Sequence, residues 1–177
     1  MERLMESNVC WVCGKPYQLI RLLGKGKGGY SYLAETDGEL VVLKQIHHEP
    51  CDYYTFGNKL DAERYDYGRL SSAGIRIPKL LAIDPETERI VKEYVDGPTI
   101  SELLLEGRSV EEYFPLVREM AAQAKAAGLN IDYYPTNFVV QKGLLWYVDY
   151  ECNAFDERWS FETWGLQHWS RDPGTAP

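Results

Sequence analysis

Three polar side chains in one short stretch have the types and the spacing of a metal and phosphate site. The stretch runs from Asn130 to Glu151; in it Asp132 and Asn137 lie five residues apart, and Asp149 follows twelve residues later. An acid beside a substrate hydroxyl can accept its proton, and amide and carboxylate oxygens can hold Mg²⁺ against a nucleotide. The pattern predicts phosphate chemistry, and its competing explanation is two acids that only cap turns.

Alternating apolar residues predict the strands that position this stretch. FVVQ and LLWYVD flank Lys142-Gly143, which predicts a hairpin with Asp149 at the exit of its second strand. From Tyr17 onward, YQLIRLL, YSYLAE and LVVLKQI predict three strands, with an Asp-Gly turn between the second and the third. IRIPKLLAID and ERIVKEYV predict two more strands, so we expect a five-stranded antiparallel sheet.

Helical spacing and terminating residues predict the helices. Residues 58–74 have helical spacing, with Leu60, Glu63, Tyr67 and Leu70 at steps of three and four, and they end at Gly74. Thr99 and Glu102 form a capping box that predicts the start of a short helix. The longest helix is expected in EEYFPLVREMAAQAKAAG, with Pro115 in its first turn, where the missing amide hydrogen costs nothing.

The C-terminal segment is rich in tryptophan. Trp159, Trp164 and Trp169 recur at steps of five, which matches neither a strand nor one helical stripe. We expect a short helix docked by its tryptophans, with the residues from Asp172 frayed.

Three further features precede the acidic stretch. Gly24, Gly26 and Gly29 satisfy a GxGxxG pattern, but the pattern lies between two strands, which favours a flap over nucleotide phosphates and disfavours a dinucleotide site before a helix. Lys44 lies within the next strand, and Glu63 lies on the helix that follows, so an acid can orient the ammonium. The backbone groups of two residues near Gly97-Pro98, the expected joint between lobes, are candidates for contacts to an adenine ring: Glu93 and Val95.

These features, in this order, resemble the protein kinase-like superfamily from about Tyr17 to Glu151. The resemblance implies an α+β, two-lobed kinase-like fold, with a five-stranded N-lobe plus one helix and a minimal, mostly helical C-lobe. It implies one domain over residues 1–177, divided into a leader (1–16), an N-lobe (17–96) and a reduced C-lobe (97–177) with the Trp-rich tail. It also implies ATP and Mg²⁺ as cofactors.

The resemblance implies a role for each candidate residue. The flap glycines would cover the phosphates, and Lys44 would contact them and pair with Glu63. Asp132 would accept the proton of the substrate hydroxyl, while Asn137 and Asp149 would bind Mg²⁺.

The sequence departs from the usual kinase pattern at several positions. Asn130-Ile131-Asp132 stands where His-Arg-Asp is usual, and the missing arginine argues against control by a phosphorylated activation loop. Asp149-Tyr150-Glu151 replaces Asp-Phe-Gly and is more similar to the aminoglycoside, choline and lipopolysaccharide kinase branch. Ser31 stands where a valine usually covers the adenine. Because only 28 residues follow Asp149, we expect no helical platform for peptide substrates, so a small open surface or a partner would receive the acceptor.

Composition limits the classes of partner. With 177 residues, 45% of them apolar, the chain has enough apolar side chains for one domain with a buried core. Acidic residues exceed basic ones by 27 to 19 and no Lys/Arg block occurs, so nucleic acid is not the expected partner. No apolar run reaches the roughly 20 residues that span a bilayer, and the acidic N-terminus is unlike a signal peptide. We therefore expect no membrane partner and a cytoplasmic protein.

The four cysteines are best explained as reduced cytosolic thiols. Cys10 and Cys13 form one C-x-x-C, which is half of a zinc site or a redox pair, but Cys51 and Cys152 are single and distant. Zinc shared with another chain stays open as an alternative.

Two functional hypotheses follow from the sequence. The first is a minimal ATP-dependent kinase, either an atypical Ser/Thr protein kinase or a small-molecule kinase of the aminoglycoside or choline type. The second is a nucleotide-binding pseudokinase that acts as a regulatory module through a protein partner or a second copy, held by the Trp-rich tail.

Overall fold

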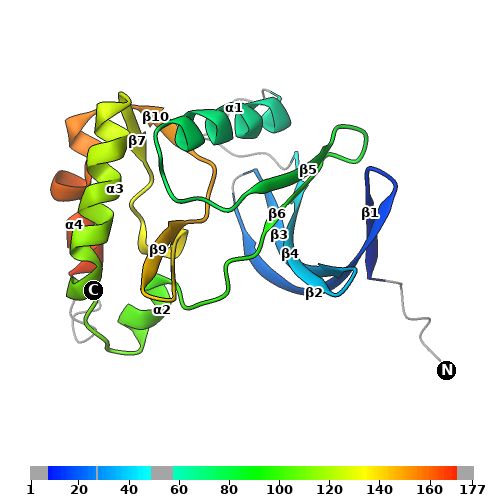
Figure 1. Ribbon diagram of the computed structural model, residues 1–177, viewed down its shortest axis with the longest axis horizontal. Coiled ribbons are helices and arrows are strands. Elements are labelled where there is room, and N and C mark those ends of the chain that lie inside the picture. The colour runs from blue at the N-terminus through cyan, green and yellow to red at the C-terminus, as the bar shows by residue number, and fades with distance from the viewer. Residues whose placement is uncertain (1–7, 27, 49–57, 171–177) are drawn as a thin grey trace. The chain divides into compact units, whose positions relative to one another are not determined.

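The computed structural model describes residues 8–26, 28–48 and 58–170, and it divides into two compact units (Figure 1). The first unit comprises Met1–Ala62 and Lys79–Tyr94, and the second comprises Glu63–Pro78 and Val95–Pro177. Helix α1 (Lys59–Ser72) therefore passes from the first unit into the second. Cys51 and the tail expected to fray from Asp172 lie outside the described residues.

Within the described residues, the first unit is a curled antiparallel sheet of six strands in the order β1-β2-β3-β4-β6-β5 (Figure 1). Neighbouring strands pair antiparallel throughout. The strands are β1 (Val9–Val12), β2 (Lys15–Lys25), β3 (Gly29–Thr36), β4 (Glu39–Ile46), β5 (Leu80–Asp84) and β6 (Arg89–Glu93).

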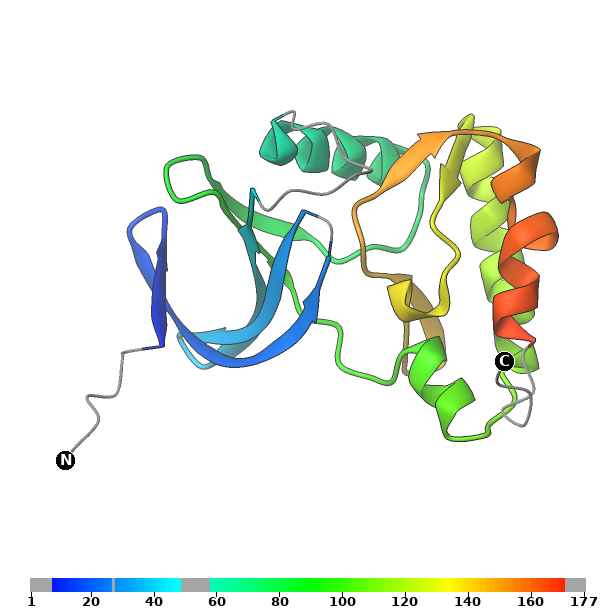
Figure 2. The same ribbon diagram turned by 180° about the vertical axis from the view of Figure 1, so that it is seen from behind.

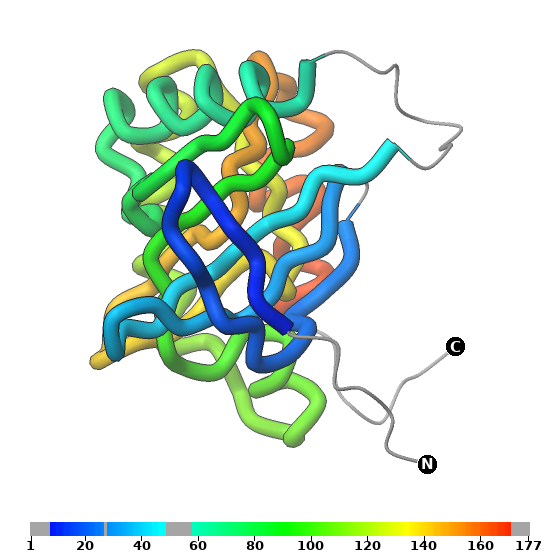
Figure 3. The backbone as a smooth tube through the Cα atoms, turned by 90° about the vertical axis from the view of Figure 1, so that its right-hand side faces the viewer, coloured from blue at the N-terminus to red at the C-terminus, as the bar shows by residue number. Residues whose placement is uncertain are grey.

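Strand β1 corrects two predictions, because it lies in the segment expected as a leader and makes the sheet six-stranded. It pairs with β2 across a turn at Cys13-Gly14, where both residues have positive φ. Figure 3 shows this hairpin in dark blue at the edge of the sheet. Four residues are too few to show an alternating pattern, but the C-terminal residue of the strand, Val12, is fully buried.

Asp84 links the two edge strands of the curled sheet, β1 and β5. One oxygen of its carboxylate accepts a 2.8 Å hydrogen bond from the Cys13 amide, and the other accepts bonds from the amides of Glu86 and Thr87. These amides lower the pKa of the Asp84 carboxyl, that of Cys13 most strongly. The turn after β1 is thereby fastened to the turn after β5, over the core of Val12, Tyr17, Ala34, Val41, Leu43 and Val91.

We predict that Asp84→Asn changes how stability depends on pH. A carboxyl whose pKa is lowered by folding contributes stability above its unfolded pKa of about 3.9 and loses it as the pH falls through the folded pKa. The variant should unfold at a lower temperature than wild type at pH 7, and the difference should shrink as the pH falls below about 4. Thermal unfolding followed by circular dichroism at pH 3 to 7 measures this, and Asp61→Asn, at an exposed site on α1, serves as control. A difference that does not vary with pH would contradict the role of the carboxylate.

The second unit combines short helices with two small antiparallel sheets. Strands β7 and β10 pair in one sheet and β8 and β9 in the other. After α1, its elements are α2 (Ile100–Leu105), a 3₁₀ turn (Glu111–Tyr113), α3 (Phe114–Ala126), β7 (Leu129–Ile131), a 3₁₀ turn (Pro135–Asn137), β8 (Phe138–Gln141), β9 (Leu144–Tyr147), β10 (Cys152–Ala154), a 3₁₀ turn (Glu157–Trp159), a π-helical turn (Phe161–Gly165) and α4 (Leu166–Trp169).

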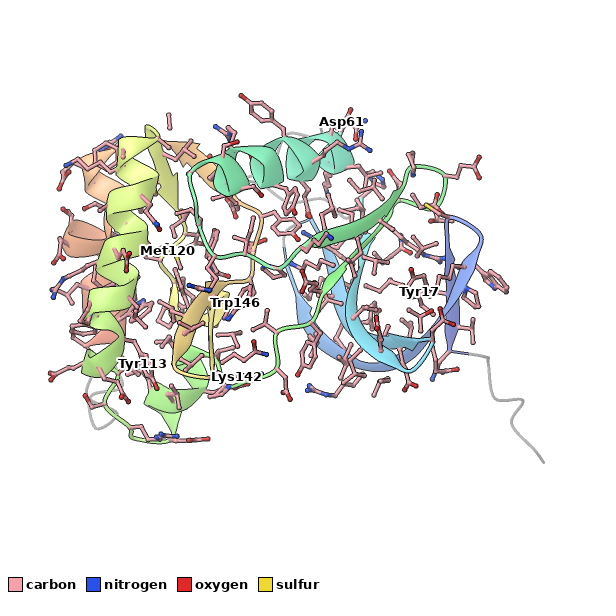
Figure 4. The ribbon with its side chains drawn as sticks, viewed as in Figure 1. Tyr17, Asp61, Tyr113, Met120, Lys142 and Trp146 are labelled. Carbon is pink, nitrogen blue, oxygen red and sulfur yellow. The ribbon has the colours of Figure 1, made fainter. Side chains whose placement is uncertain are left out.

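One core runs through the second unit. Helix α3 lies beside the C-terminal segment, as Figures 1 and 2 both show, and it contributes Val117, Met120 and Ala124 to the core. Met120 is labelled in Figure 4. The β7–β10 pair was not predicted, because three-residue strands 21 positions apart carry no periodic signal of their own.

Three local predictions for the second unit are confirmed, but the prediction that its α3 is the longest helix is wrong, because α1 has 14 residues and α3 has 13. Thr99 Oγ1 accepts from the Glu102 amide and the Glu102 carboxylate accepts from the Thr99 amide, each at 3.0 Å, so the capping box is complete. Helix α3 has its proline in the first turn, and β8 and β9 form the expected hairpin. Gly97 tolerates no side chain, because a Cβ there would lie 2.0 Å from the carbonyl oxygen of Val140.

The tryptophan tail is more irregular than the single short helix expected. Its helical elements are a 3₁₀ turn, a π-helical turn and one turn of α-helix. Trp169 is buried at 1% exposure, whereas Trp159 is 53% exposed. The prediction that the tryptophans dock the tail is therefore confirmed for Trp169 and wrong for Trp159. Within the described ranges, none of the helices combines the length and apolar character needed to cross a membrane.

Candidate functional site

Asp132 follows directly after β7, whose three residues are all buried. Its Oδ1 accepts a 3.1 Å hydrogen bond from the Tyr134 amide, and its carbonyl accepts a 3.3 Å bond from the side-chain amide of Asn137. The loop from Asp132 to Asn137 is therefore held by one hydrogen bond to the side chain of Asp132 and one to its carbonyl. Among the described residues, no hydrogen bond occupies Oδ2 of Asp132, so that oxygen is available to a ligand.

Asn137 ends a 3₁₀ turn and is linked to the segment before Asp149. Its backbone carbonyl accepts a 2.9 Å hydrogen bond from the Val148 amide, one residue before Asp149. Because its Nδ2 donates to a carbonyl, the side-chain oxygen Oδ1 is the atom left for a ligand. The structure thus brings Asp132, Asn137 and Asp149 together within one unit.

Two buried tyrosines flank Asp149. Tyr147, which ends β9, is completely buried, and Tyr150 is 2% exposed. The Tyr150 hydroxyl donates to the Pro78 carbonyl, and its ring centre lies 5.0 Å from that of Tyr67. Asp149 Oδ1 accepts a 2.8 Å bond from the Tyr150 amide. Its anchored neighbours hold the backbone of Asp149 in place.

The side-chain oxygens of Asn137 and Asp149 are candidate ligands for a magnesium ion. They come from adjacent, hydrogen-bonded chain segments, and Mg²⁺ binds through one or two carboxylates together with substrate phosphates. In the part of the chain that the structure describes, no group of three or more His, Cys, Asp or Glu side chains is arranged to hold a metal ion. Cys13 instead directs its thiol to the Ile83 carbonyl.

The sequence did not predict the hydrogen bonds by which Tyr147 and Trp169 contact the loop of Asp132. The Tyr147 hydroxyl accepts a bond from the Asp132 amide (3.1 Å) and donates one to the Glu151 carbonyl (2.7 Å). Burial raises the pKa of Tyr147 well above its ordinary value, and the negative charge of Asp149 acts in the same direction. Trp169 Nε1 donates a 2.7 Å bond to the carbonyl of Tyr133, next to Asp132.

The available sequence signals for these two residues were incomplete. Tyr147 occupies a core-facing position of the strand LLWY, but no sequence pattern identifies the partners of its hydroxyl. Trp169 was expected to dock, but its partner 36 positions earlier was not predicted.

In the first unit, Gly29 and Lys44 lie in contact. A Cβ on Gly29 would lie 3.0 Å from Lys44 Cε and 2.7 Å from the Gln45 carbonyl oxygen, so the lysine side chain occupies the space that the glycine leaves. Gly26 donates to the Gly29 carbonyl and closes the turn between β2 and β3. Around Gly24 and Gly26, by contrast, there is room for a side chain. The fold requires glycine at only one of the three flap positions.

We predict that Gly29→Ala destabilises the protein by about 1–3 kcal/mol, the usual range for overpacking. The new methyl group would push against Lys44 and the backbone of β4. Gly24→Ala should leave the free energy of unfolding within about 0.5 kcal/mol of wild type, because no atom lies within 4 Å of its Cβ position. Urea denaturation of the two variants gives the comparison. Equal losses at both positions would contradict the steric argument.

The remaining predicted residues are divided between the units. Glu93 ends β6 in the first unit, where its Oε1 accepts a 2.9 Å bond from the Lys79 amide. Val95 is buried in the second unit. Glu63 lies on the part of α1 that belongs to the second unit. Two turns further along that helix, Arg69 donates to the Cys152 carbonyl at 3.0 Å and so attaches α1 to β10.

A shallow hollow of about 570 Å³ lies along α1 in the second unit. It is lined by Arg64, Tyr65, Gly68, Arg69, Ser72, Ala73, Ala127 and Leu129. None of the predicted site residues lines it.

Comparison with known proteins adds one informative similarity. No protein-family model matches the sequence. Over 93 residues, the chain is 27% identical to the KEOPS complex subunit Bud32 of Pyrococcus abyssi (strain GE5 / Orsay). The similarity supports a place in the kinase-like superfamily. The match covers 50% of this chain and 42% of Bud32, so it spans less than half the length of that relative. The curled antiparallel sheet is consistent with a kinase-like N-lobe.

Proposed function

We propose that this protein is an ATP- and Mg²⁺-dependent phosphotransferase, and more specifically a minimal atypical Ser/Thr protein kinase. The observation that carries the proposal is the hydrogen-bonded arrangement of Asp132, Asn137 and the segment leading to Asp149. The partial similarity to Bud32 supports it independently.

The residues of the second unit would carry out the transfer. The acceptor oxygen would attack the γ-phosphorus while the bond between that phosphorus and the β–γ bridging oxygen breaks and ADP leaves. Asp132 would take the proton of the acceptor hydroxyl. Asn137 and Asp149 would hold Mg²⁺, which neutralises phosphate charge when it is bound.

The residues that would bind the nucleotide lie in both units. Lys44 would contact the phosphates and pair with Glu63, and the close packing of Gly29 on the lysine stem supports a flap over the same phosphates. Glu93 and Val95 would offer backbone groups to the adenine. The flap residues are Gly24, Gly26 and Gly29.

The acceptor would approach beside an exposed aromatic group next to Asp132. Tyr134 is 46% exposed, its ring centre lies 6.5 Å from that of Trp164, and Trp164 contacts the exposed Trp159. Partly exposed aromatic clusters are common at protein interfaces. The name of Bud32 describes a subunit of a complex, which supports a protein partner here, as acceptor or as regulator.

A second candidate is a nucleotide-binding pseudokinase that acts as a regulatory module. The exposed Trp159 and Tyr134 favour it, because a docking surface needs no catalysis. A small-molecule kinase of the aminoglycoside or choline type is a further alternative, favoured by Asp149-Tyr150-Glu151.

Two measurements on the full chain distinguish these functions. Mg·ATP should raise the unfolding temperature, and labelled γ-phosphate should pass from ATP to a protein in a cell lysate. Binding without transfer to any acceptor would favour the pseudokinase. Transfer only to small amines or sugars would favour the small-molecule kinase. Neither binding nor transfer would overturn the proposal.

A further inference from the structure

A single tyrosine hydroxyl lies between the backbones of the two segments that carry the predicted catalytic and metal-binding acids. The Tyr147 oxygen is 3.1 Å from the amide nitrogen of Asp132 and 2.7 Å from the carbonyl oxygen of Glu151. An amide nitrogen can only donate and a carbonyl oxygen can only accept. The hydroxyl therefore accepts from Asp132 and donates to Glu151, and its orientation is set by its partners.

The position of this hydroxyl follows from the pairing of β7 with β10. The last residue pair of that ladder is Ile131 with Cys152, so Asp132 and Glu151 are the next residues on each side. At this point the hydroxyl stands between the two backbones, where a direct backbone hydrogen bond would otherwise continue the ladder. Tyr147 thus spaces the two segments as well as joining them.

The tyrosine ring is held rigidly. Tyr147 is completely buried, and its ring centre lies 5.3 Å from that of Phe138 in the core. Its backbone amide donates a 2.9 Å bond to the carbonyl of Arg76. Because both the ring and the backbone are fixed, the hydroxyl has little freedom to move. A close-packed interior transmits that rigidity to the groups that it contacts.

We propose that Tyr147 is a positioning residue that sets the distance between the carboxylate of Asp132 and that of Asp149. The inference rests on the proposed phosphotransfer, in which the two carboxylates must address the acceptor hydroxyl and the metal together. Tyr147 lies two residues before Asp149 on the same chain segment, and its hydroxyl fixes the backbone of Asp132. One side chain therefore ties the backbone position of Asp132 to that of the segment that carries Asp149.

Tyr147→Phe tests the proposal, because it keeps the ring and removes only the hydroxyl. The kcat of phosphate transfer should fall by about 10- to 100-fold, the scale of a misplacement of about 1 Å, while the KM for Mg·ATP stays within about twofold. The matched control is Tyr113→Phe. It removes a hydroxyl from a tyrosine that packs against the same core from the 3₁₀ turn before α3, outside the proposed site. Its kcat should stay within about twofold of wild type.

A second readout tests the hydrogen bond without turnover. In the wild-type protein, the Asp132 amide should be protected from hydrogen exchange, and Tyr147→Phe should lose that protection. A rapidly exchanging Asp132 amide in wild type would overturn the bridge even if the variant does not fold. Unchanged kcat in a folded Tyr147→Phe protein, with wild type active, would overturn the positioning role alone. An inactive wild type would overturn the proposed function and the positioning role, although amide exchange would still report on the bridge.

Discussion

Asp132→Asn is expected to slow phosphate transfer by about 10²- to 10⁴-fold, the contribution typical of a positioned general base. Asparagine keeps an oxygen to accept the bond from the Tyr134 amide, so the loop should keep its conformation. What it loses is the ability to take the proton of the acceptor. Transfer of labelled γ-phosphate from ATP, compared between wild type and variant, measures the effect.

Two controls separate chemistry from binding in this experiment. Stabilisation by Mg·ATP should stay close to that of wild type, because Asn137 and Asp149 are unchanged. Asp61→Asn makes the same chemical change at an exposed site on α1, labelled in Figure 4, and should leave transfer unaffected. Full activity of Asp132→Asn would refute the assignment of Asp132 as the base.

Trp169→Ala is expected to lower the free energy of unfolding by about 3–5 kcal/mol, the range for removing a large buried aromatic side chain. The indole is 1% exposed, and its ring centre lies 5.1 Å from that of Phe138 and 5.5 Å from that of Phe161. The substitution would leave a large cavity and remove the hydrogen bond to the buried Tyr133 carbonyl. Urea denaturation followed by circular dichroism measures the loss.

The tail offers a matched control in Trp159→Ala. Trp159 is 53% exposed, so its truncation should cost within about 1 kcal/mol. Trp169→Phe should fall between the two, because it keeps a ring in the core but removes the donor to Tyr133. If Trp159→Ala were as costly as Trp169→Ala, the assignment of Trp169 as the anchor of the tail would be wrong.

Under the proposed function, the anchoring of the tail by Trp169 also affects catalysis. The indole donor holds the residue next to Asp132, whose own amide is held by Tyr147. The catalytic loop is therefore fixed from two sides by side chains outside the loop. Trp169→Phe should accordingly reduce kcat as well as stability.

The sequence predicts well the features that depend on near neighbours. The capping box at Thr99 and Glu102, the proline in the first turn of α3 and the hairpin before Asp149 all form as expected. Each depends on backbone hydrogen bonds or dihedral angles within a few residues, and residue type restricts these directly. The spacing from Asp132 to Asn137 belongs to the same class, because one short loop contains both.

Only the tertiary structure decided the features that depend on partners distant in the sequence. β1 joins the sheet and β7 pairs with β10, although strands of three or four residues have no measurable period. The contact between Gly29 and Lys44 also required the register of β3 against β4. Strand pairing and register depend on how much apolar surface the whole unit buries. The residue type at one position does not specify that burial.

The acidic stretch shows both kinds of information. Its sequence alone identified Asp132, Asn137 and Asp149 as an acid, an amide and an acid on a loop and at a strand exit. The structure added the hydroxyl of Tyr147 and the indole of Trp169, which fix that loop from the core. Neither contact could be inferred from spacing, because a buried polar atom takes whichever partner the packed core places within hydrogen-bonding distance.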